Sequence, residues 1–382
     1  MRVLWLGTYE RDYPRTRVLI AGLREIGVEV DERHRPLWER SRHKAGEYLA
    51  PARLALTAGG FVAAWGRLAA AGARAPAPDA LVAGYPAQPD APLAWALARS
   101  RGVPLVCDMM ISLSDTLAGD RGRVGRGAGA VLAGADRLAL RAADLAIADT
   151  AANADWLAER FGVPRRRLAV VPVGAEPGPF APAPDPPGPP TALFYGKLAP
   201  LHGIETVLAA ARMPGVPPVR VVGDGQLGPW LAAELRRDPP PGLRHERWIP
   251  YERLGDAVRE AAVCLGIFGT SAKAARVVPN KVWQAMAAGR PVVTADTAGA
   301  REVLRDGEHA LLVPAGDPGA LAHALRRLAG DPALRRRLGA AARARYLELG
   351  TPPAVAGRFR DALEAALAER RAPAGGSTLR SR

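Results

Sequence analysis

Short apolar runs alternate with helical patterns along the first half of the chain. The run RVLWLG at residues 2–7 precedes a polar turn, an amphipathic stretch over 14–26 and a second strand-like run at 28–30. This order predicts a parallel sheet with helices on both faces. The alternation continues through four further strand-like runs and three helical stretches: strands at 80–84, 103–108, 145–148 and 168–172, and helices at 92–100, 131–142 and 151–161.

The alternation stops at residues 175–190, where AEPGPFAPAPDPPGPP holds eight prolines and no sustained periodicity. Pro-rich segments are stiff and extended, so we expect an interdomain linker here. The pattern then resumes with strands at 191–195, 219–222, 263–267, 291–294 and 310–313, and helices at 204–212, 227–237, 281–288, 318–329, 332–349 and 353–371.

The sequence therefore predicts an α/β fold of two Rossmann-like domains that face each other across a cleft. A chain of 382 residues exceeds the roughly 250–300 residues at which one hydrophobic core stops growing. Ligands of such folds bind where the carboxyl edges of the parallel strands meet. The expected parts are an N-terminal domain (1–174), the linker (175–190), a C-terminal domain (191–350), a helix (351–371) that packs back toward the N-terminal domain and a disordered tail (372–382).

The net charge of +14 raises the hypothesis of a nucleic-acid partner, which the distribution of basic residues does not favour. Only four of the 52 basic residues are lysines, and the arginines are spread along the whole chain without interleaved aromatic residues. We therefore predict no nucleic-acid partner. No apolar stretch of about 18 residues lacks charge. The segment 54–73 contains Arg67 and is either a surface-docking helix or an amphipathic core helix, so we expect a cytoplasmic protein, with peripheral association at the inner face of the membrane left open.

The densest candidate chemistry begins at residue 268. Pro279-Asn280 leads into a helix expected to start at Lys281, with Asn280 as its N-cap. A helix N-terminus with a lysine in its first turn is suited to a diphosphate. Gln284 lies one turn further on the same side, where it could reach a ribose hydroxyl. A capped core helix with an incidental lysine is the competing interpretation.

Basic residues and glycines also follow two earlier strands of the C-terminal half. Lys197 comes directly after a strand, and His202 leads into the next helix. Gly223-Asp224-Gly225 forms a third turn of this kind, although this tripeptide alone is equally typical of a tight turn. Together with Lys281, these residues favour a phosphate-binding site over solvated side chains.

The N-terminal half offers weaker signals. Gly7 and Thr8 end the first strand at the expected cleft, where a glycine lets the backbone approach a diphosphate. Asp115 lies in CDMMISLSDTLAGDR, after another strand. It is a candidate for a polar role toward the acceptor or the sugar, and a helix cap at Ser114 or Asp115 is the alternative.

Several stretches of the C-terminal half resemble the nucleotide-binding domain of the family 4 retaining glycosyltransferases, which have the GT-B fold. They are VVPVGAEPGPFAP, GKLAPLHGIETVLAA, VVGDGQ and PNKVWQAMAAGRPVVTADTAGAREVLRDGEHALLVPAGD, over about residues 170–350, with a looser match in WLGTYERDYPRTRVLIAGLREIGVEV. The resemblance implies a nucleotide-sugar donor, a glycan, lipid-linked or small-molecule acceptor, retention of anomeric configuration, and neither a metal nor a separate cofactor.

The resemblance also assigns positions, and this chain departs from the family at several of them. Lys197 stands where the family usually has a phosphate-binding Arg, and His202 where it has Lys. Gln284 occupies the position of the ribose-binding Glu. Arg276 falls where the first Glu of a paired-glutamate motif would be and reverses the charge beside the transferred sugar.

Metal-free stabilisation of the leaving diphosphate is consistent with the residues present. No two aspartates are separated by a single residue, so the usual metal-binding Asp-X-Asp pattern is absent. Lys197 and Lys281, with Arg276, His202 and the amides around Pro279, could stabilise the charge instead.

Two alternatives stay open. A sugar-nucleotide epimerase with a similar fold needs carboxylates in the cleft, and the replaced glutamates argue against it. A non-catalytic sugar-nucleotide-binding subunit of a glycan-assembly complex is supported by the altered residues at positions 202, 276 and 284.

Overall fold

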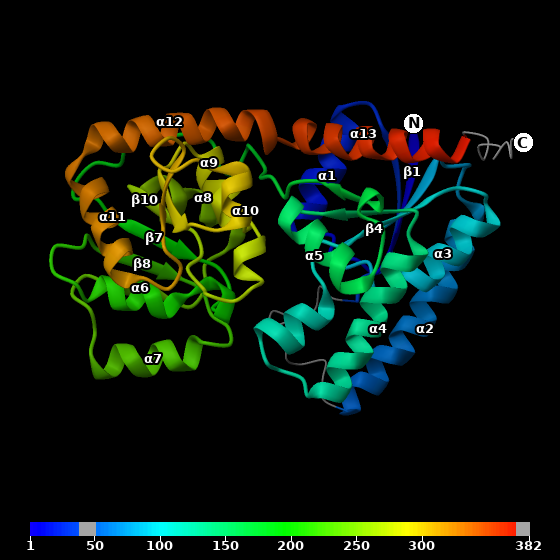
Figure 1. Cartoon of the computed structure of the whole chain (residues 1–382), viewed down its shortest axis with the longest axis horizontal. Coiled ribbons are helices and arrows are strands. Elements are labelled where there is room, and N and C mark those ends of the chain that lie inside the picture. The colour runs from blue at the N-terminus through cyan, green and yellow to red at the C-terminus, as the bar shows by residue number, and fades with distance from the viewer. Residues whose placement is uncertain (38–50, 372–382) are drawn as a thin grey trace, which may run out of the picture.

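The computed structural model describes residues 1–37 and 51–371, without the side chains of 51–58, and shows two α/β domains (Figure 1). The tail 372–382 that was predicted to be disordered lies outside the described residues.

The N-terminal domain is built on a parallel sheet of six strands in the order β2-β1-β3-β4-β5-β6. The strands are β1 (Arg2–Gly7), β2 (Glu29–His34), β3 (Ala80–Ala83), β4 (Leu105–Asp108), β5 (Leu145–Ala148) and β6 (Leu168–Val170). Its helices are α1 (Pro14–Glu25), α2 (Pro51–Arg74), α3 (Ala91–Ser100), α4 (Arg126–Ala142) and α5 (Ala151–Phe161), with a π-helical turn at Asp115–Asp120.

The C-terminal domain repeats this plan with the strand order β12-β11-β10-β7-β8-β9. The strands are β7 (Ala192–Tyr195), β8 (Val219–Val222), β9 (Arg244–Glu246), β10 (Val263–Leu265), β11 (Val292–Ala295) and β12 (Ala310–Val313). Its helices are α6 (Ile204–Ala211), α7 (Gly228–Arg237), α8 (Tyr251–Glu260), α9 (Asn280–Ala287), α10 (Ala298–Val303), α11 (Pro318–Gly330) and α12 (Pro332–Leu349), and the chain ends in α13 (Pro352–Arg371).

The strand order reverses at one place in each sheet. In the first sheet the chain moves outward from β1 to β2 and then returns to β3 on the other side of β1. In the second sheet it moves from β7 through β9 and returns to β10 beside β7. The carboxyl ends of the strands at such a switch point line the ligand site in this kind of fold. The turns after β1, β7 and β10 are therefore the places to look for chemistry.

The two-domain α/β architecture predicted from the sequence is confirmed, and the differences are local. The helix expected at 131–142 begins five residues earlier, at Arg126, and the strand expected at 28–30 extends to His34. Strand β9 and helices α8 and α10 were not predicted. Strand β9 has the sequence RHE and pairs only with β8, so it shows none of the apolar character of a central strand.

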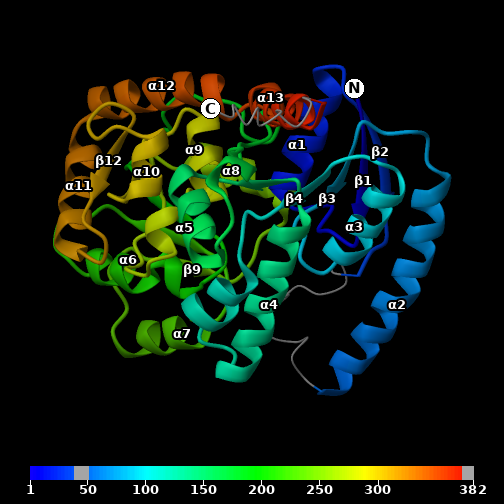
Figure 2. The same cartoon turned by 45° about the vertical axis from the view of Figure 1, so that its right-hand side comes forward.

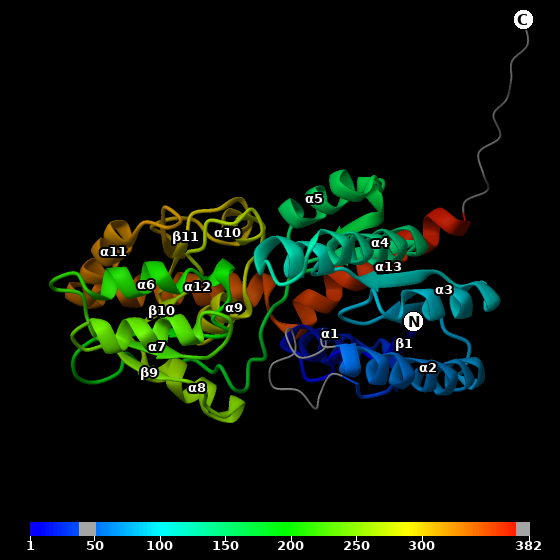
Figure 3. The ribbon, with the colours of Figure 1, turned by 90° about the horizontal axis from the view of Figure 1, so that it is seen from below.

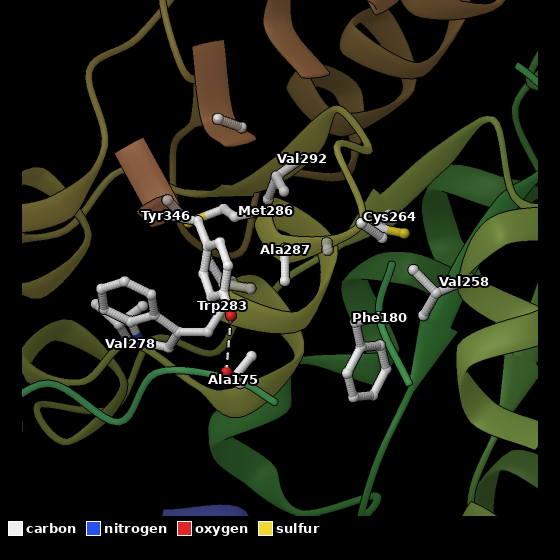
Figure 4. Packing of buried hydrophobic residues seen from close by; sticks show 14 of the residues in the cluster. Ala175, Phe180, Val258, Cys264, Val278, Trp283, Met286, Ala287, Val292 and Tyr346 are labelled. Carbon is white, nitrogen blue, oxygen red and sulfur yellow. Dashed lines mark hydrogen bonds between the residues drawn. The ribbon is translucent and has the colours of Figure 1, made fainter. Parts of the chain in front are cut away.

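The segment after β6 does not run free between the domains. Ala175 and Phe180 are buried in a hydrophobic cluster that is formed mainly by the C-terminal domain and also contains Trp283 and Tyr346. The Tyr346 hydroxyl donates a hydrogen bond of 2.8 Å to the Ala175 carbonyl, which Figure 4 shows among the packed side chains. The Ala175 amide donates to the Gly350 carbonyl, at 3.0 Å.

The last helix lies on the N-terminal domain. Figure 1 shows α12 along the C-terminal domain and α13 along the N-terminal domain. Val355 and Phe359 of α13 are buried with Val18 of α1 in one cluster. A Cβ atom on Gly22 would lie 1.9 Å from the Pro352 carbonyl oxygen, so α1 and α13 touch backbone to backbone.

The two domains also meet through α5 and α10, which lie side by side (Figure 2). Both oxygens of the Glu302 carboxylate on α10 accept hydrogen bonds from the first amides of α5, Ala151 at 2.6 Å and Ala152 at 2.8 Å. A carboxylate at a helix N-terminus is a favourable cap, and here the other domain supplies it. Seen from below, α2 and α3 lie at the end of the N-terminal domain that is away from this junction (Figure 3).

Replacing Gly350 by alanine should lower the stability of the protein. The added Cβ would lie 2.6 Å from the Trp283 ring and 2.8 Å from the Tyr346 ring, so buried aromatic residues must shift. Such overpacking typically lowers the free energy of unfolding by about 1–3 kcal/mol. Gly357→Ala on α13 is the matched control, because nothing lies within 4 Å of its added Cβ. Thermal unfolding should show a clear fall for Gly350→Ala and none for the control. Equal melting temperatures for the two variants would contradict this packing.

Candidate functional site

The candidate site lies at the switch point of the second sheet. Strand β7 ends at Tyr195, and Gly196 follows it with a positive φ of 130°. A Cβ on Gly196 would lie 3.5 Å from Lys281 Nζ and 3.6 Å from His202 Cε1. Residues expected at a phosphate site are therefore brought together around a glycine that leaves space between them.

Lys281 is the most unusual residue of this group. Its side chain comes from the first turn of α9, it is only 5% exposed, and Nζ lies 3.9 Å from the centroid of the Phe194 ring. Among the described residues, no hydrogen-bond acceptor reaches Nζ. Burial lowers the pKa of Lys281 to about 7. A buried ammonium without an acceptor is unfavourable, so this position is suited to an anionic ligand.

His202 lies next to it in an uncharged state. Burial, followed by the nearby charge of Lys281, lowers the pKa of His202 well below its ordinary value. Nδ1 contacts the Lys197 carbonyl. A carbonyl can only accept, so Nδ1 carries the proton and the lone pair of the neutral ring lies on Nε2. Lys197 itself is exposed, at the rim of the site.

Gln284 is held from within the domain. It is 3% exposed, and its Oε1 accepts a hydrogen bond of 2.9 Å from the Tyr195 hydroxyl. Tyr195 ends β7, so this bond fixes the Gln284 side chain to the same strand that leads into the Gly196 turn.

Gly223 and Gly225 bring two turns into backbone contact. Both have positive φ, and a Cβ would lie 1.9 Å from the Gly196 oxygen at Gly223 and 2.8 Å from the Leu198 nitrogen at Gly225. Only glycine allows this approach. The backbone of the turn after β8 therefore packs directly against the backbone of the turn after β7, next to Lys281 and His202.

The prediction that Asn280 caps α9 is wrong. Pro279 occupies the N-cap position with extended φ and ψ, Asn280 is already the first helical residue, and proline has no side-chain acceptor for the first turn. Pro279 is extended, with φ −73° and ψ 155°, and the helical conformation starts directly after it. The helix therefore begins at Asn280, one residue earlier than expected. The Asn280 side chain instead hydrogen-bonds Tyr13 of the N-terminal domain.

Arg276 lies at the junction of the domains. Its guanidinium pairs with Asp115 at 2.9 Å and stacks at 4.2 Å over the Trp156 ring, both from the N-terminal domain. Its carbonyl accepts a hydrogen bond from the Thr150 hydroxyl. The structure thus pairs two residues that the sequence had suggested separately, one for the donor and one for the acceptor side.

Two further charged residues of this junction were not among the site residues chosen from the sequence. Lys273 is 8% exposed, donates to the Thr116 hydroxyl, and has its pKa lowered to about 8 by burial. Arg121 follows the π-helical turn, and its carbonyl accepts a bond of 2.9 Å from Gln226. A signal for Lys273 existed, because lysine is rare in this chain and three of the four lysines lie in the C-terminal half.

Gly7 and Thr8 are engaged within their own domain. The Thr8 amide and hydroxyl both donate to Oδ2 of Asp90, at 2.6 and 2.9 Å. A Cβ on Gly7 would lie 2.5 Å from the same oxygen, so the glycine makes room for Asp90. The structure does not join these two residues to the Lys281 group.

Within the part of the chain that the structure describes, no group of three His, Cys, Asp or Glu residues is arranged to hold a metal ion. In the same part of the chain, no helix combines the length and apolar character needed to cross a membrane.

The comparisons with known families cover both domains. Residues 8–174 match the model of the glycosyl transferase 4-like domain, and residues 204–359 match the glycosyl transferase-like model. These matches and the two facing sheets define the class as GT-B glycosyltransferases. Together the two matches identify a family 4-like glycosyltransferase, in agreement with that part of the resemblance inferred from the sequence.

Curated relatives agree with this assignment. The chain is 30% identical over 227 residues to a D-inositol 3-phosphate glycosyltransferase of Streptomyces bingchenggensis, an alignment that covers 53% of this chain and 48% of the relative. It is 37% identical over 161 residues to the phosphatidyl-myo-inositol mannosyltransferase of Mycobacterium leprae, covering 40% of each. The chain spans about half the length of the curated relatives it matches.

Solved structures share the fold over nearly the whole chain. Sucrose-phosphate synthase of Thermosynechococcus elongatus aligns with a TM-score of 0.73 and 20% identity, covering 96% of this chain and 99% of that one. HepE of Anabaena in complex with UDP-glucose aligns with a TM-score of 0.69 and 16% identity, covering 96% and 100%.

Replacing Lys281 by methionine should stabilise the ligand-free protein. The lysine is protonated in the unfolded chain up to pH about 10 but binds its proton weakly when folded, so its burial destabilises the folded state. The gain should reach a few kcal/mol, at about 1.4 kcal/mol per unit of pKa. It should be full below pH 7 and shrink as the pH rises toward 10.5. Thermal melts at several pH values measure it, with exposed Lys197→Met as control. A lower melting temperature for Lys281→Met at pH 6 would contradict the burial of a charge.

Proposed function

We propose that the protein transfers a sugar from a nucleoside-diphosphate sugar to a glycan, lipid-linked or small-molecule acceptor, with retention of anomeric configuration and without a metal ion. The observation that carries the proposal is the buried ammonium of Lys281, which has no hydrogen-bond acceptor among the described residues and lies at the switch point of the second sheet. A diphosphate is the ligand that satisfies this position.

The chemistry follows from charge. Breaking the bond between sugar and phosphate leaves a nucleoside diphosphate whose growing negative charge must be stabilised. Lys281 supplies a cation away from water, where its interaction with a phosphate oxygen is strongest. Lys197 adds a second, exposed cation at the rim. Binding of the diphosphate raises the pKa of Lys281 and so keeps it charged at neutral pH.

The structural neighbours support the choice of donor. HepE of Anabaena has been solved with UDP, with UDP-glucose, and with UDP and glucose. The C-terminal half of this chain shares the fold of these neighbours, which supports a nucleotide as its ligand. We therefore propose a nucleotide sugar as the donor here, with Gln284 near the ribose and the Arg276–Asp115 pair near the transferred sugar.

A donor screen tests the proposal directly. The protein is incubated with UDP-, GDP-, ADP- and TDP-sugars, with and without EDTA, and release of nucleoside diphosphate is measured. One donor series should be turned over despite EDTA, and Lys281→Met should lower the rate by roughly 10²-fold. Arg358→Met, an exposed cation on α13, should leave the rate unchanged.

Each other outcome has a definite meaning. Turnover that EDTA abolishes and Mg²⁺ or Mn²⁺ restores would overturn the metal-free mechanism. Donor binding without turnover, with glycan, lipid-linked and small-molecule acceptors supplied, would favour the non-catalytic binding subunit. Interconversion of the donor sugar without transfer would favour the epimerase. NMR of the product reports its anomeric configuration.

We further propose that the protein works in the cytoplasm, at the inner face of the membrane. On α2 and α4, which both pack against α3, Val62, Val131 and Leu138 are 73%, 74% and 54% exposed. Arg67, Arg126 and Arg137 are exposed on the same two helices. Asp136 is the one acidic residue in α2 and α4, and it is fully buried. An apolar and basic surface of this kind suits anionic lipid.

Vesicle flotation tests this association. The protein should float with vesicles containing anionic lipid and not with zwitterionic ones. Val131→Glu combined with Leu138→Glu should abolish flotation, because the change removes exposed apolar contacts and adds negative charge. Leu347→Glu, at a 53% exposed leucine on α12, serves as control. Unchanged flotation of the double variant would refute this surface.

A further inference from the structure

Arg121 joins the two domains beside the candidate site. It directly follows the π-helical turn Asp115–Asp120 of the N-terminal domain, and its amide donates to the Thr116 carbonyl at 3.1 Å. Its carbonyl accepts a hydrogen bond of 2.9 Å from the Gln226 side chain of the C-terminal domain. The backbone of Arg121 is thus held from both domains.

The residue that holds Arg121 belongs to the turn that supports the phosphate site. Gln226 follows Gly225 directly, and a Cβ on Gly225 would lie 2.8 Å from the Leu198 nitrogen. Leu198 follows the Gly196 turn, where Lys281 and His202 meet. The Gln226 side chain and the packed backbone of these two turns therefore connect Arg121 with the Lys281 group.

The side chain of Arg121 lies among other cations. Its charge contributes to the lowered pKa of His202 and of Lys273, so the guanidinium is near both. Its Nε is buried, and no hydrogen-bond partner for this atom is found in the described residues. Nε of Arg276, which is 9% exposed, is in the same condition.

The local balance of charge calls for an anion. Arg121, Lys273 and Arg276 lie among three acidic residues, Asp115, Asp120 and Asp149. With Lys281 counted, the cations named here outnumber these carboxylates by one. A buried excess of charge is unfavourable unless a ligand of opposite sign compensates for it. The unpaired N–H groups and the extra charge together indicate a polyanion between the domains.

We propose that Arg121 contacts the diphosphate of the donor from the N-terminal domain, across the cleft from Lys281. This inference rests on the proposed function. A guanidinium offers several N–H donors in a plane that matches two phosphate oxygens, and it stays charged when buried. Arg121 then stabilises the leaving diphosphate only while the domains are together, so that cleavage of the sugar–phosphate bond depends on closure.

Arg123 provides a matched control. It lies two residues further in the same loop and also reaches Gln226, with Nε 3.3 Å from Oε1, but it is exposed. Arg121→Gln and Arg123→Gln therefore remove the same charge from the same loop, once where Nε is buried and once at the exposed surface.

The experiment measures both kinetics and binding in the full-length protein. Arg121→Gln should lower kcat by roughly 10²-fold. Its affinity for the nucleoside diphosphate should fall roughly 10-fold, while its affinity for the nucleoside monophosphate stays unchanged. Arg121→Lys should recover part of the loss, and Arg123→Gln should match the wild type in every measurement.

Three outcomes would overturn the proposal. Unchanged kcat in Arg121→Gln would show that the residue does not act on the reaction. Equal losses of affinity for diphosphate and monophosphate, together with a lower melting temperature, would show that Arg121 only holds the domains together. If the wild type turns over no donor, the proposed function fails separately, and the comparison of diphosphate with monophosphate binding still decides the role of Arg121.

Discussion

A positive charge held inside the C-terminal domain is the constraint on which the rest of the site depends. Lys281 is buried against the Phe194 ring, and no hydrogen-bond acceptor among the described residues reaches its ammonium. Evolution of a stable core alone would favour an apolar residue at this position. Gly223 and Gly225 pack two turns closely, and Gly196, where an added Cβ would lie 3.5 Å from Nζ, places no side chain of its own against the ammonium. Under the proposed function, the ammonium is held in this position to meet an anionic diphosphate.

The contacts of Arg276 and Lys273 join one domain to the other. Arg276 pairs with Asp115, and Lys273 bonds Thr116, in each case from one domain to the other. The charge reversal at Arg276 relative to the family pattern is thus compensated locally by a carboxylate from the N-terminal domain. Sugar recognition in this chain, under the proposed function, depends on a pair of opposite charges that the two domains build together, whereas the family pattern supplies acidic residues from one domain.

The sequence predicted what local patterns encode. The central strands were found because burial on both faces makes them continuous apolar runs, while β9 was missed because an edge strand of sequence RHE lacks that pattern. Lys281 and His202 were expected near each other because residues after parallel strands share one edge, and both lie beside Gly196. The pairing of Arg276 with Asp115 spans 161 positions, and that of Thr8 with Asp90 spans 82, so no local pattern could reveal either. Asn280 was misjudged because Pro279 already terminates the extended segment.

The chain passes between the domains twice, after Gly174 and again at Gly350, and the two passages lie against each other. Ala175 bonds the Gly350 carbonyl, and a Cβ on Gly174 would lie 2.6 Å from that same oxygen. Because the two crossings are adjacent, the covalent connections between the domains are gathered at one place on their boundary. The Tyr346–Ala175 bond lies at this place, whereas the Arg276–Asp115 pair lies away from it. Any movement of one domain relative to the other would therefore strain the Arg276–Asp115 pair more than the crossings themselves.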